Sequence, residues 1–396
     1  MSIIYFFMLF GVLTADGLMI FLTPVLVYQL TGSIEYSGLS YALWWLPRCM
    51  IIPLIGKYID YLGIRPLSII SDAIKSAGCM FLAFSHFSSD LEIAVAFGIV
   101  GSLISIGNSQ TIISYEKIVS LISKYKDHHV NLISRMDFSG MVVGPLIGMI
   151  LIDYSIRVIL IVPCVLYIVN AIFFFSRKKG LNTNHEHNVN DKEHSPVIFT
   201  DYKQGFKLII LAPALILSVF LASGNNLFDG LVESTGAALI DRNMGLPVKY
   251  FGMIDVVAGV FGVAGTYLYG MISVHYNRNN LLAGAVLVIT GSSIMLIAYP
   301  SSFPIFVGAY ALSIVGKVFT GNICRMIRIE KIPVASFAGT SSIIVLLNQS
   351  VLPLIGLIIY FSGDSTELIS LFMIIAVLIT FLSGVLLWRH LNTSEG

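Results

Sequence analysis

The chain has 396 residues, of which 56% are hydrophobic and 11% are charged, and its mean hydropathy is +0.87. A soluble domain carries roughly a quarter charged residues, so the composition excludes a soluble enzyme, a nucleic-acid binder and a disordered protein. The four cysteines lie in or beside apolar stretches without CxxC spacing, which indicates neither a disulfide framework nor a zinc site. Because so few residues are charged, the chain is expected to be an integral membrane protein, and its net charge is +1.

Apolar runs that are long enough to cross a bilayer recur along the whole chain. A transmembrane helix needs about 20 largely apolar residues, and this length predicts twelve spans in an all-α protein, with no room for a separate soluble domain. The predicted spans cover roughly 3–29, 37–56, 67–88, 92–114, 136–153, 157–176, 208–228, 249–271, 280–299, 303–322, 338–361 and 368–388.

Lys and Arg residues gather on one side of this topology. If both termini are cytoplasmic, most basic residues fall in inner loops or at inner helix ends, whereas Arg157, Arg242 and Lys249 fall on the outer side. This distribution follows the positive-inside rule. We therefore expect both termini in the cytoplasm.

One long polar stretch divides the spans into two sets. It covers residues 177–207 and contains NTNHEHNVNDKEH, so we expect a cytoplasmic linker between a six-helix bundle at 1–176 and a second one at 208–396. Its three histidines allow a metal-binding tract, but a solvated linker needs no ligand, and we expect neither a metal nor a cofactor. FTDYKQGFKL, near its end, has the spacing of an amphipathic helix on the membrane surface.

Short sequences recur in the two halves. GPLIG at Gly144–Gly148 is echoed by LPLIG at Leu352–Gly356, and the glycine that opens GKYIDYLGIR at Gly56 is echoed by the one that opens GMISVHYNR at Gly270. Both pairs are about 210 residues apart, which suggests the internal duplication common in transporters. It predicts a binding cavity between the halves, near the midplane, that opens alternately to each side.

The loop after the second predicted span resembles a signature of the major facilitator superfamily. That signature reads approximately G-x-x-x-D-x-x-G-R-[RK], and Gly56, Asp60, Gly63 and Arg65 match it, with Ile64 at the first basic position. The resemblance implies that the aspartate and the basic residue belong to a cytoplasmic latch between helices. A generic positive loop would explain Arg65 but not the spacing of the glycines and the aspartate.

GMVVGPLIG in the fifth predicted span is similar to a motif of the antiporter branch of this superfamily. The matching residues are Gly140, Gly144, Pro145 and Gly148, and the resemblance favours export over import. Glycines four residues apart also allow two helices to pack closely, and Pro145 kinks a helix. Close packing alone is therefore the alternative explanation of the motif.

The N-terminal stretch, from LTADGLMIFLTPVLVYQLTGS to IRPLSIISDAIKS, is similar to bacterial siderophore exporters of the enterobactin type and to macrolide efflux proteins. This resemblance implies a monomeric carrier in the bacterial inner membrane that exports a siderophore or other small metabolite by alternating access, in proton antiport. Its partners would be the small-molecule substrate, protons and membrane lipid. A drug or macrolide efflux pump, an uptake carrier, a ferroportin-like metal exporter and a lipid flippase remain alternatives. An enzyme is not expected, because the chain has no Walker, HExxH or G-x-S-x-G motif.

A charge inside a predicted span is costly unless it is paired or in contact with water, and five such residues are taken as candidates: Asp16, Arg48, Asp72, Asp255 and Lys317. At about 1.5 Å per residue, Arg48 and Asp72 lie at nearly the same depth, which favours a structural ion pair. Asp16 lies near the middle of its span without an obvious partner, so it is a candidate for proton coupling or substrate binding. Bonds to hydroxyl or backbone groups, or a pair with Arg48, are its alternatives. Asp255 and Lys317 are predicted to contact substrate or each other.

Amide side chains at the same depths are candidates for the polar wall of the cavity. They occur in the predicted spans four, seven and eleven, and the region of span four lacks the arginine motif of multidrug proton antiporters. The candidates are Asn108, Gln110, Asn225, Asn226, Asn348 and Gln349.

Overall fold

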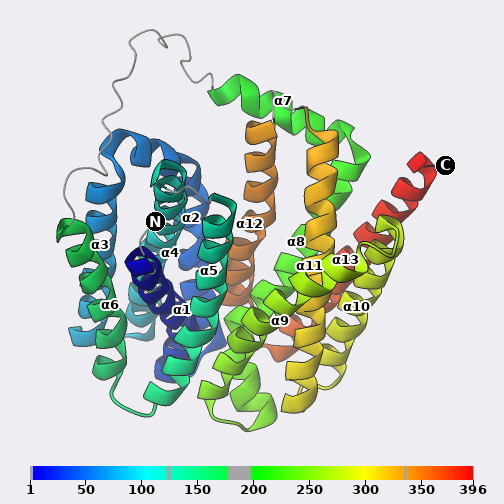
Figure 1. Cartoon of the computed structure of the whole chain (residues 1–396). Helices are drawn as coiled ribbons and strands as arrows, with labels where there is room; N and C mark the ends of the chain where they lie inside the picture. The colour runs from blue at the N-terminus through cyan, green and yellow to red at the C-terminus, as the bar shows by residue number, and fades with distance from the viewer. Residues whose placement is uncertain (1–2, 123–125, 177–197, 334–336, 396) are drawn as a thin grey trace.

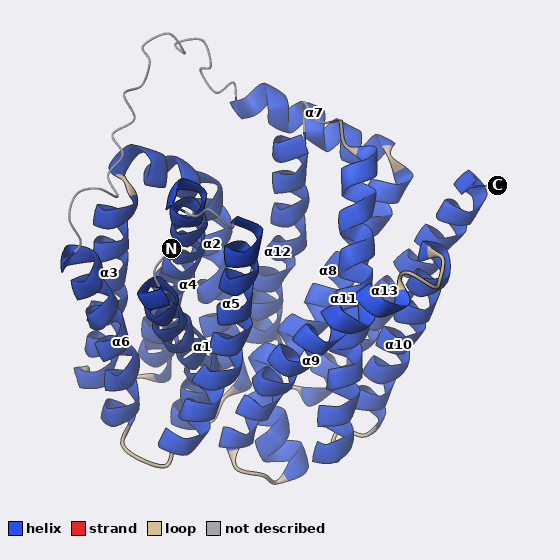
Figure 2. Ribbon diagram, viewed as in Figure 1, coloured by secondary structure: helices blue, strands red, loops and turns tan. Residues whose placement is uncertain are grey.

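The structure is a computed structural model that describes residues 3–122, 126–176, 198–333 and 337–395, and every regular element in these ranges is a helix (Figure 2). Two short elements, a π-helix at Leu239–Asn243 and a 3-10 helix at Val248–Phe251, follow α8. The α-helices are α1 (Ile3–Thr31), α2 (Ile34–Leu62), α3 (Ile64–Phe84), α4 (Asp90–Ile122), α5 (Lys126–Leu151), α6 (Ile156–Ser176), α7 (Ile198–Leu211), α8 (Pro213–Ala238), α9 (Gly252–Ile272), α10 (Arg278–Ala298), α11 (Phe303–Lys331), α12 (Phe337–Ser362) and α13 (Thr366–Glu395).

The long helices form two groups that stand side by side (Figure 1). Helices α1–α6 lie on the left of the view and α8–α13 on the right, with α7 running across the top. We call the end at which α6 stops and α7 lies the linker end, and the opposite end the far end. Because successive long helices alternate in direction, both ends of the described chain belong to the linker end.

The prediction of an all-helical membrane protein is confirmed. Ten helices in the described part of the chain are long and apolar enough to cross a bilayer. Of the other long helices, α2 packs against α4 and α12, and α5 packs against α1 and α9.

Helix α7 contains the segment in which an amphipathic helix is predicted. It ends at Leu211, and α8 begins at Pro213, whose ring fixes φ and removes the N–H that would have continued the preceding helix. The predicted boundary between residues 207 and 208 therefore falls inside a helix, which packs against α12. The rest of the predicted linker, including its histidines, lies outside the described residues.

The packing within the first half recurs in the second half. α1 packs against α5 and α6 as α8 packs against α12 and α13, and α2 packs against α4 as α9 packs against α11. α5 and α12, which contain the repeated sequences GPLIG and LPLIG, each have an internal proline, Pro145 and Pro353. Each helix of the first half thus corresponds to the helix seven places later, with α7 as the extra element. The contacts between the halves, α2 with α12 and α5 with α9, obey the same rule.

The glycines of the α5 motif lie where α5 crosses α1. A Cβ on Gly140 would stand 2.7 Å from the backbone carbonyl carbon of Leu13, and a Cβ on Gly144 would collide with the backbone nitrogen of Leu18. Gly148 faces a phenylalanine ring of α1 in the same way. The two backbones therefore touch, which only glycine allows, so helix packing accounts for all three positions.

The loop motif after α2 is described only in part. Gly63 joins α2 to α3 with a φ of 85°, a left-handed value that favours glycine. Arg65 donates from Nε to the carbonyl of Phe174, 3.0 Å away, and from Nη2 to the carbonyl of Phe175, 2.6 Å away. These carbonyls end α6, where the helix dipole favours a cation, so Arg65 ties α3 to α6. The side chains of the other two motif residues, Gly56 and Asp60, lie outside the described part.

Candidate functional site

A cavity with a volume of about 310 Å³ lies between the two halves. We call it the central cavity. Its walls come from α1, α2, α4 and α5 of the first half and from α8 and α9 of the second, with Phe251 just before α9. Its polar and aromatic lining residues are Asp16, Ser40, Tyr41, Trp44, Trp45, Arg48, Asn108, Asp137, Glu233, Phe251 and Asp255.

Asp16 lies in this wall, at the centre of a buried polar cluster. Its Oδ1 is 3.1 Å from the Nζ of Lys75 and accepts a hydrogen bond of 2.7 Å from the hydroxyl of Tyr167, while its Oδ2 accepts one of 2.9 Å from Asn108. The side chains of Asp16 and Lys75 are 1% and 0% exposed. The expectation that Asp16 has no partner at its own depth is therefore wrong, because Lys75 on α3 supplies the counter-charge.

Asp72 belongs to the same cluster, one turn before Lys75 on α3. Its Oδ1 is 3.7 Å from Lys75 Nζ, and its Oδ2 accepts a hydrogen bond of 2.5 Å from Asn170 on α6. The predicted Arg48–Asp72 ion pair does not form, although the two residues are close in depth. The reason is rotational: Asp72 faces α6 and α1, whereas Arg48 faces the cavity. We call Asp16, Asp72 and Lys75 the shared-lysine cluster.

Arg48 lines the central cavity from α2. Its Nη1 donates to the hydroxyl of Ser105, 3.0 Å away, and its guanidinium lies 4.8 Å from the centre of the Trp45 ring. Asp137 on α5 is close enough for its charge to act on Arg48. The guanidinium is therefore held between an aromatic face and a hydroxyl, and the Asp137 carboxylate lines the same cavity.

The second half contributes two carboxylates to the central cavity. Glu233 on α8 accepts a hydrogen bond of 2.8 Å from the hydroxyl of Tyr41, which comes from α2 of the other half. Asp255 on α9 presents an Oδ2 that is inaccessible to solvent and accepts no hydrogen bond in the described part of the protein. Asp255 and Lys317 do not pair, which removes one of the two options that the sequence left open.

Lys317 instead pairs with Asp229 on α8. The pair lines a separate pocket with Asn225 and Asn226. Asp229 stands in α8 about 210 residues after Asp16 in the corresponding helix α1, so each half has a carboxylate at a related position that pairs with a lysine. The lysines come from non-equivalent helices, α3 and α11.

A larger cavity, of about 880 Å³, lies between the halves toward the linker end. Asp137 lines both this linker-end cavity and the central cavity. Three arginines, Arg135, Arg325 and Arg328, also line it. The two cavities together lead from the middle of the protein toward the linker end.

At the far end the halves are joined by polar contacts. Arg242 donates to the carbonyl of Gly32 of the first half, 2.7 Å away, and pairs over 3.1 Å with Asp364 of its own half, which accepts a hydrogen bond from the backbone N–H of Ile34 in the first half. The hydroxyl of Tyr28 donates to Asp241 over 2.9 Å, and a second ion pair joins Lys249 to Asp153 of the first half. The structure is thus closed at the far end and hollow toward the linker end.

The six amide candidates fall into different environments. Asn108 lies in the central cavity, and Asn226 and Asn348 line the linker-end cavity, where Asn226 donates to the Asn348 carbonyl over 2.8 Å. Asn225 is buried and donates to Thr320. Gln110 donates to Ser68 and Ser114 on the α3–α4 side, away from both cavities, and Gln349 is half-buried in α12 and lines neither of them.

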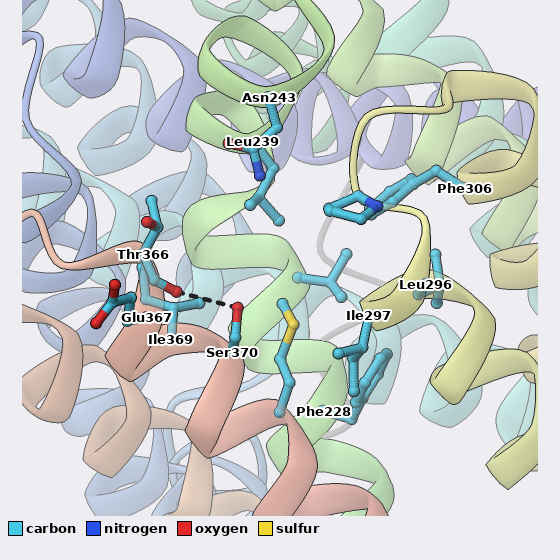
Figure 3. Close-up of a pocket in the computed structure, with 13 residues that line it drawn as sticks. Phe228, Leu239, Asn243, Leu296, Ile297, Phe306, Thr366, Glu367, Ile369 and Ser370 are labelled. Atoms are coloured by element: carbon cyan, nitrogen blue, oxygen red, sulfur yellow. Dashed lines mark hydrogen bonds between the residues drawn. The ribbon is translucent and has the colours of Figure 1, made fainter.

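A further pocket, of about 230 Å³, lies within the second half alone (Figure 3). Its wall is mostly apolar, with Phe228, Leu296 and Phe306 pointing into it, and Ser370 donates to a backbone carbonyl of its own helix. No residue of α1–α6 lines it. It therefore takes no part in the path between the halves.

Three site residues were not singled out from the sequence as cavity residues: Lys75, Asp137 and Glu233. Lys75 had a signal, since it follows Asp72 by three residues inside an apolar run and so lies on the same helix face. Asp137 is the second residue of the predicted span 136–153 and Glu233 lies just past the predicted span 208–228, and charges are common at the ends of spans. The described residues contain no group of three or more His, Cys, Asp or Glu side chains that could hold a metal ion.

The profile of the Major Facilitator Superfamily matches residues 1–356. The chain belongs to this superfamily. The resemblance found in the loop motif and in the α5 motif is thereby confirmed at the level of the superfamily, and the chain is a membrane transporter by family. No curated protein matches its sequence.

Solved structures of transporters have the same fold. A D-xylose–proton symporter superimposes with a TM-score of 0.72 at 14% identity, covering 98% of each chain, and a nucleoside transporter with 0.75 at 11%, covering 97% of this chain and 98% of that one. A bacterial homologue of the iron transporter ferroportin, in an inward-facing state, gives 0.71 at 15%, covering 98% and 99%. Identities this low establish the fold alone. These neighbours are transporters, not enzymes.

Proposed function

We propose that the chain is a secondary carrier that exports a small organic molecule by alternating access, in exchange for protons. The observation that carries this proposal is a central cavity between two pseudo-symmetric halves with a proton-binding candidate, Asp16, in its wall. The cavity is cut off from the far end and leads toward the linker end, as one state of a rocking carrier requires.

The shared-lysine cluster supports the proton coupling. Asp16 and Asp72 share the single ammonium of Lys75, so the cluster carries a net charge of −1 when all three groups are ionised. Binding one proton makes the buried cluster neutral and leaves one complete ion pair. Because burying an uncompensated charge is costly, the cluster favours taking up a proton whenever water reaches it.

Asp16 is the member that links the proton to the cargo. It lines the central cavity, whereas Asp72 faces Asn170 behind α3. A cargo that displaces Asn108 from Asp16, or touches Asp16 directly, changes the charge balance of the whole cluster. Proton binding and cargo binding then compete at one carboxylate, which is the requirement for antiport.

The distribution of the basic residues indicates to which side of the membrane the cavity opens. With the linker end in the cytoplasm of a bacterial cell, as the positive-inside rule indicates, the structure is open inward and closed outward. The bundles at 1–176 and 208–396 would rock about the α2–α12 and α5–α9 contacts within a single chain. The resemblance of the N-terminal stretch suggests a siderophore or related metabolite as the first candidate for the cargo, and a macrolide or other drug is the second candidate, favoured by the aromatic wall of the cavity.

Transport in proteoliposomes tests the proposal. A proton gradient imposed on the reconstituted protein should drive cargo against its own gradient, and collapsing the gradient should stop it. Asp16→Asn removes the ionisable group while keeping the shape of the side chain, so gradient-driven transport should disappear. Glu367→Gln, in the pocket within the second half, is the matched control and should transport normally. Gradient-driven export by Asp16→Asn at the wild-type rate would show that the coupling role is wrong.

A further inference from the structure

The charges around the central cavity are unbalanced. The charge of Asp16 is matched by Lys75, and that of Asp137 lies beside Arg48. Glu233 and Asp255 remain, and neither forms an ion pair in the described part of the protein. The cavity wall therefore presents two carboxylates from the second half that form no ion pair in the described part of the protein. Arg48, the cation that lines the same cavity, instead donates to Ser105 and lies over the Trp45 ring.

Asp255 has an unused hydrogen-bonding position. Its Oδ2 is shielded from solvent and accepts no hydrogen bond, although it belongs to a residue that lines the cavity. Buried polar atoms are nearly always bonded, because an unbonded one loses its hydration without compensation. An oxygen in this state at a cavity wall points to a donor that the protein itself does not supply.

The rest of the wall is aromatic and apolar. Tyr41, Trp44 and Trp45 line it from α2, and Phe251 lines it from the second half. Aromatic faces attract cations with an apolar surface, and this wall already holds one, because the Arg48 guanidinium lies 4.8 Å from the centre of the Trp45 ring. The same wall would disfavour a compact, strongly hydrated ion.

We propose that the central cavity binds an organic cation, an amine or quaternary ammonium with an apolar body, as the cargo of this carrier. The cationic group lies between Glu233 and Asp255, and the body lies against Tyr41, Trp44 and Phe251. This inference rests on the proposed function and specifies its cargo. It speaks against a polyanionic siderophore, which would meet two unpaired carboxylates, and against a bare metal ion, for which the described residues offer no ligand group.

The arginines of the linker-end cavity do not reverse this preference. Arg135, Arg325 and Arg328 line the larger cavity, of about 880 Å³, where water and salt screen charges within roughly 8–10 Å. The central cavity is much smaller, and its carboxylates are more deeply enclosed, so their field is screened less. An anion would be attracted to the entrance and rejected at the site, and the test therefore includes an anion.

Binding of two small probes to the purified protein in lipid nanodiscs tests the inference. Benzyltrimethylammonium and phenylmethanesulfonate share a benzyl group and carry permanent charges of opposite sign. The protein has three tryptophans, and replacing Trp388, which lies outside the cavity, by Phe leaves Trp44 and Trp45 to report binding by fluorescence. The cation should bind at least about tenfold more tightly than the sulfonate, because sign complementarity dominates in an enclosed site.

The variants Glu233→Gln and Asp255→Asn should each raise the dissociation constant of the cation about tenfold or more. Glu233→Gln alters the hydrogen bond from Tyr41 and could therefore impair folding. Asp255→Asn breaks no hydrogen bond at Oδ2, so we expect this variant to fold in either case. Glu367→Gln should leave the constant unchanged. Equal or tighter binding of the sulfonate, or wild-type cation affinity in Asp255→Asn, would overturn the inference.

This binding assay is independent of transport. Cation binding that depends on Asp255, together with an absence of proton-driven transport, would refute the proposed carrier function and leave the cation site standing. Proton-driven transport in a protein that prefers the sulfonate would refute the cation site and leave the proposed carrier function standing.

Discussion

At the scale of single residues, the decisive feature is one lysine shared by two buried carboxylates. Lys75 is fully buried, and the side chains of Asp16 and Asp72 are each 1% exposed. Charges so far from water are tolerated only when they are paired and hydrogen-bonded, and Tyr167, Asn108 and Asn170 complete the hydrogen bonding. Removing the lysine therefore leaves two carboxylates at close range with no counter-charge.

We expect Lys75→Met to lower the free energy of unfolding by about 3–5 kcal/mol, the usual cost of removing one partner of a buried pair. Thermal unfolding of the detergent-purified protein measures this loss. Lys249→Met is the matched control, because its pair with Asp153 is largely exposed and is worth at most about 1 kcal/mol. The triple variant Asp16→Asn, Asp72→Asn, Lys75→Met should recover most of the stability without restoring transport. Equal stability of Lys75→Met and Lys249→Met would contradict the burial argument.

Depth along a helix could be predicted from residue numbers, but side-chain partners could not. Arg48 and Asp72 are at similar depth, yet they point to different neighbours, because depth says nothing of rotation about each helix axis. Lys75 lies one turn from Asp72, and it meets Asp16 only because α3 packs near α1. A charged residue in a predicted span is therefore a candidate site residue, but its partner depends on how the helices are rotated and packed.

At the scale of elements, the crossing of α1 and α5 is the tightest constraint. The backbone carbonyl carbon of Leu13 lies 2.7 Å from where a Cβ on Gly140 would be. A methyl group there cannot be accommodated by rotating a side chain, because the clash is with backbone. The helices would have to separate, and Asp16, three residues after Leu13, would move with α1.

We expect Gly140→Ala to destabilise the protein by about 1–3 kcal/mol, the usual cost of overpacking, and to slow transport because Asp16 moves away from Lys75. Gly284→Ala is the matched control, since a Cβ on this exposed glycine of α10 meets no atom within 4 Å. Thermal unfolding and transport rates measured on both variants check this expectation. An unchanged melting temperature in Gly140→Ala would mean that α1 and α5 are farther apart than the structure places them.

The hydropathy pattern found most of the spans because lipid-facing helices must be apolar. α2 and α5 carry Tyr41, Arg48 and Asp137 toward the path between the halves. Hydropathy alone does not show which face of a span is turned toward that path.

At the scale of the whole molecule, the closure of the far end holds the two halves in one relative orientation. Arg242 contributes most to it, through Gly32, Asp364 and the hydroxyl of Tyr28, to which its Nε donates over 3.1 Å. Gly32 and Tyr28 belong to the first half, and Asp364, in the second half, accepts a hydrogen bond of 2.8 Å from the backbone N–H of Ile34 in the first half. A rocking motion would have to break these contacts between the halves. At the linker end, the large cavity of about 880 Å³ lies between the two halves, where the far end has these contacts.

We expect Arg242→Ala to weaken this closure by roughly 1 kcal/mol, which is enough to shift the populations of two states several-fold. Spin labels are placed at Tyr154 of the first half and Tyr299 of the second, both exposed at the far end. Pulsed electron paramagnetic resonance should show a larger share of long label-to-label distances in Arg242→Ala than in the wild type. Arg278→Ala, which breaks an ion pair with Glu330 inside the second half, is the control and should leave the distances unchanged. Identical distance distributions in all three proteins would show that these contacts do not hold the halves together.

The amino-acid sequence by itself determined the membrane class, the helical architecture and the superfamily, because hydrocarbon thickness, the cost of buried charge and short glycine motifs all act locally along the chain. It also placed Asp16, Arg48, Asn108 and Asp255 among the candidates. Only the tertiary structure decided that Lys75 serves both Asp16 and Asp72, that Glu233 meets Tyr41, and that Asp255 faces the cavity unbonded. Those contacts depend on how helices far apart in the chain are rotated and packed against one another, and no local pattern encodes that.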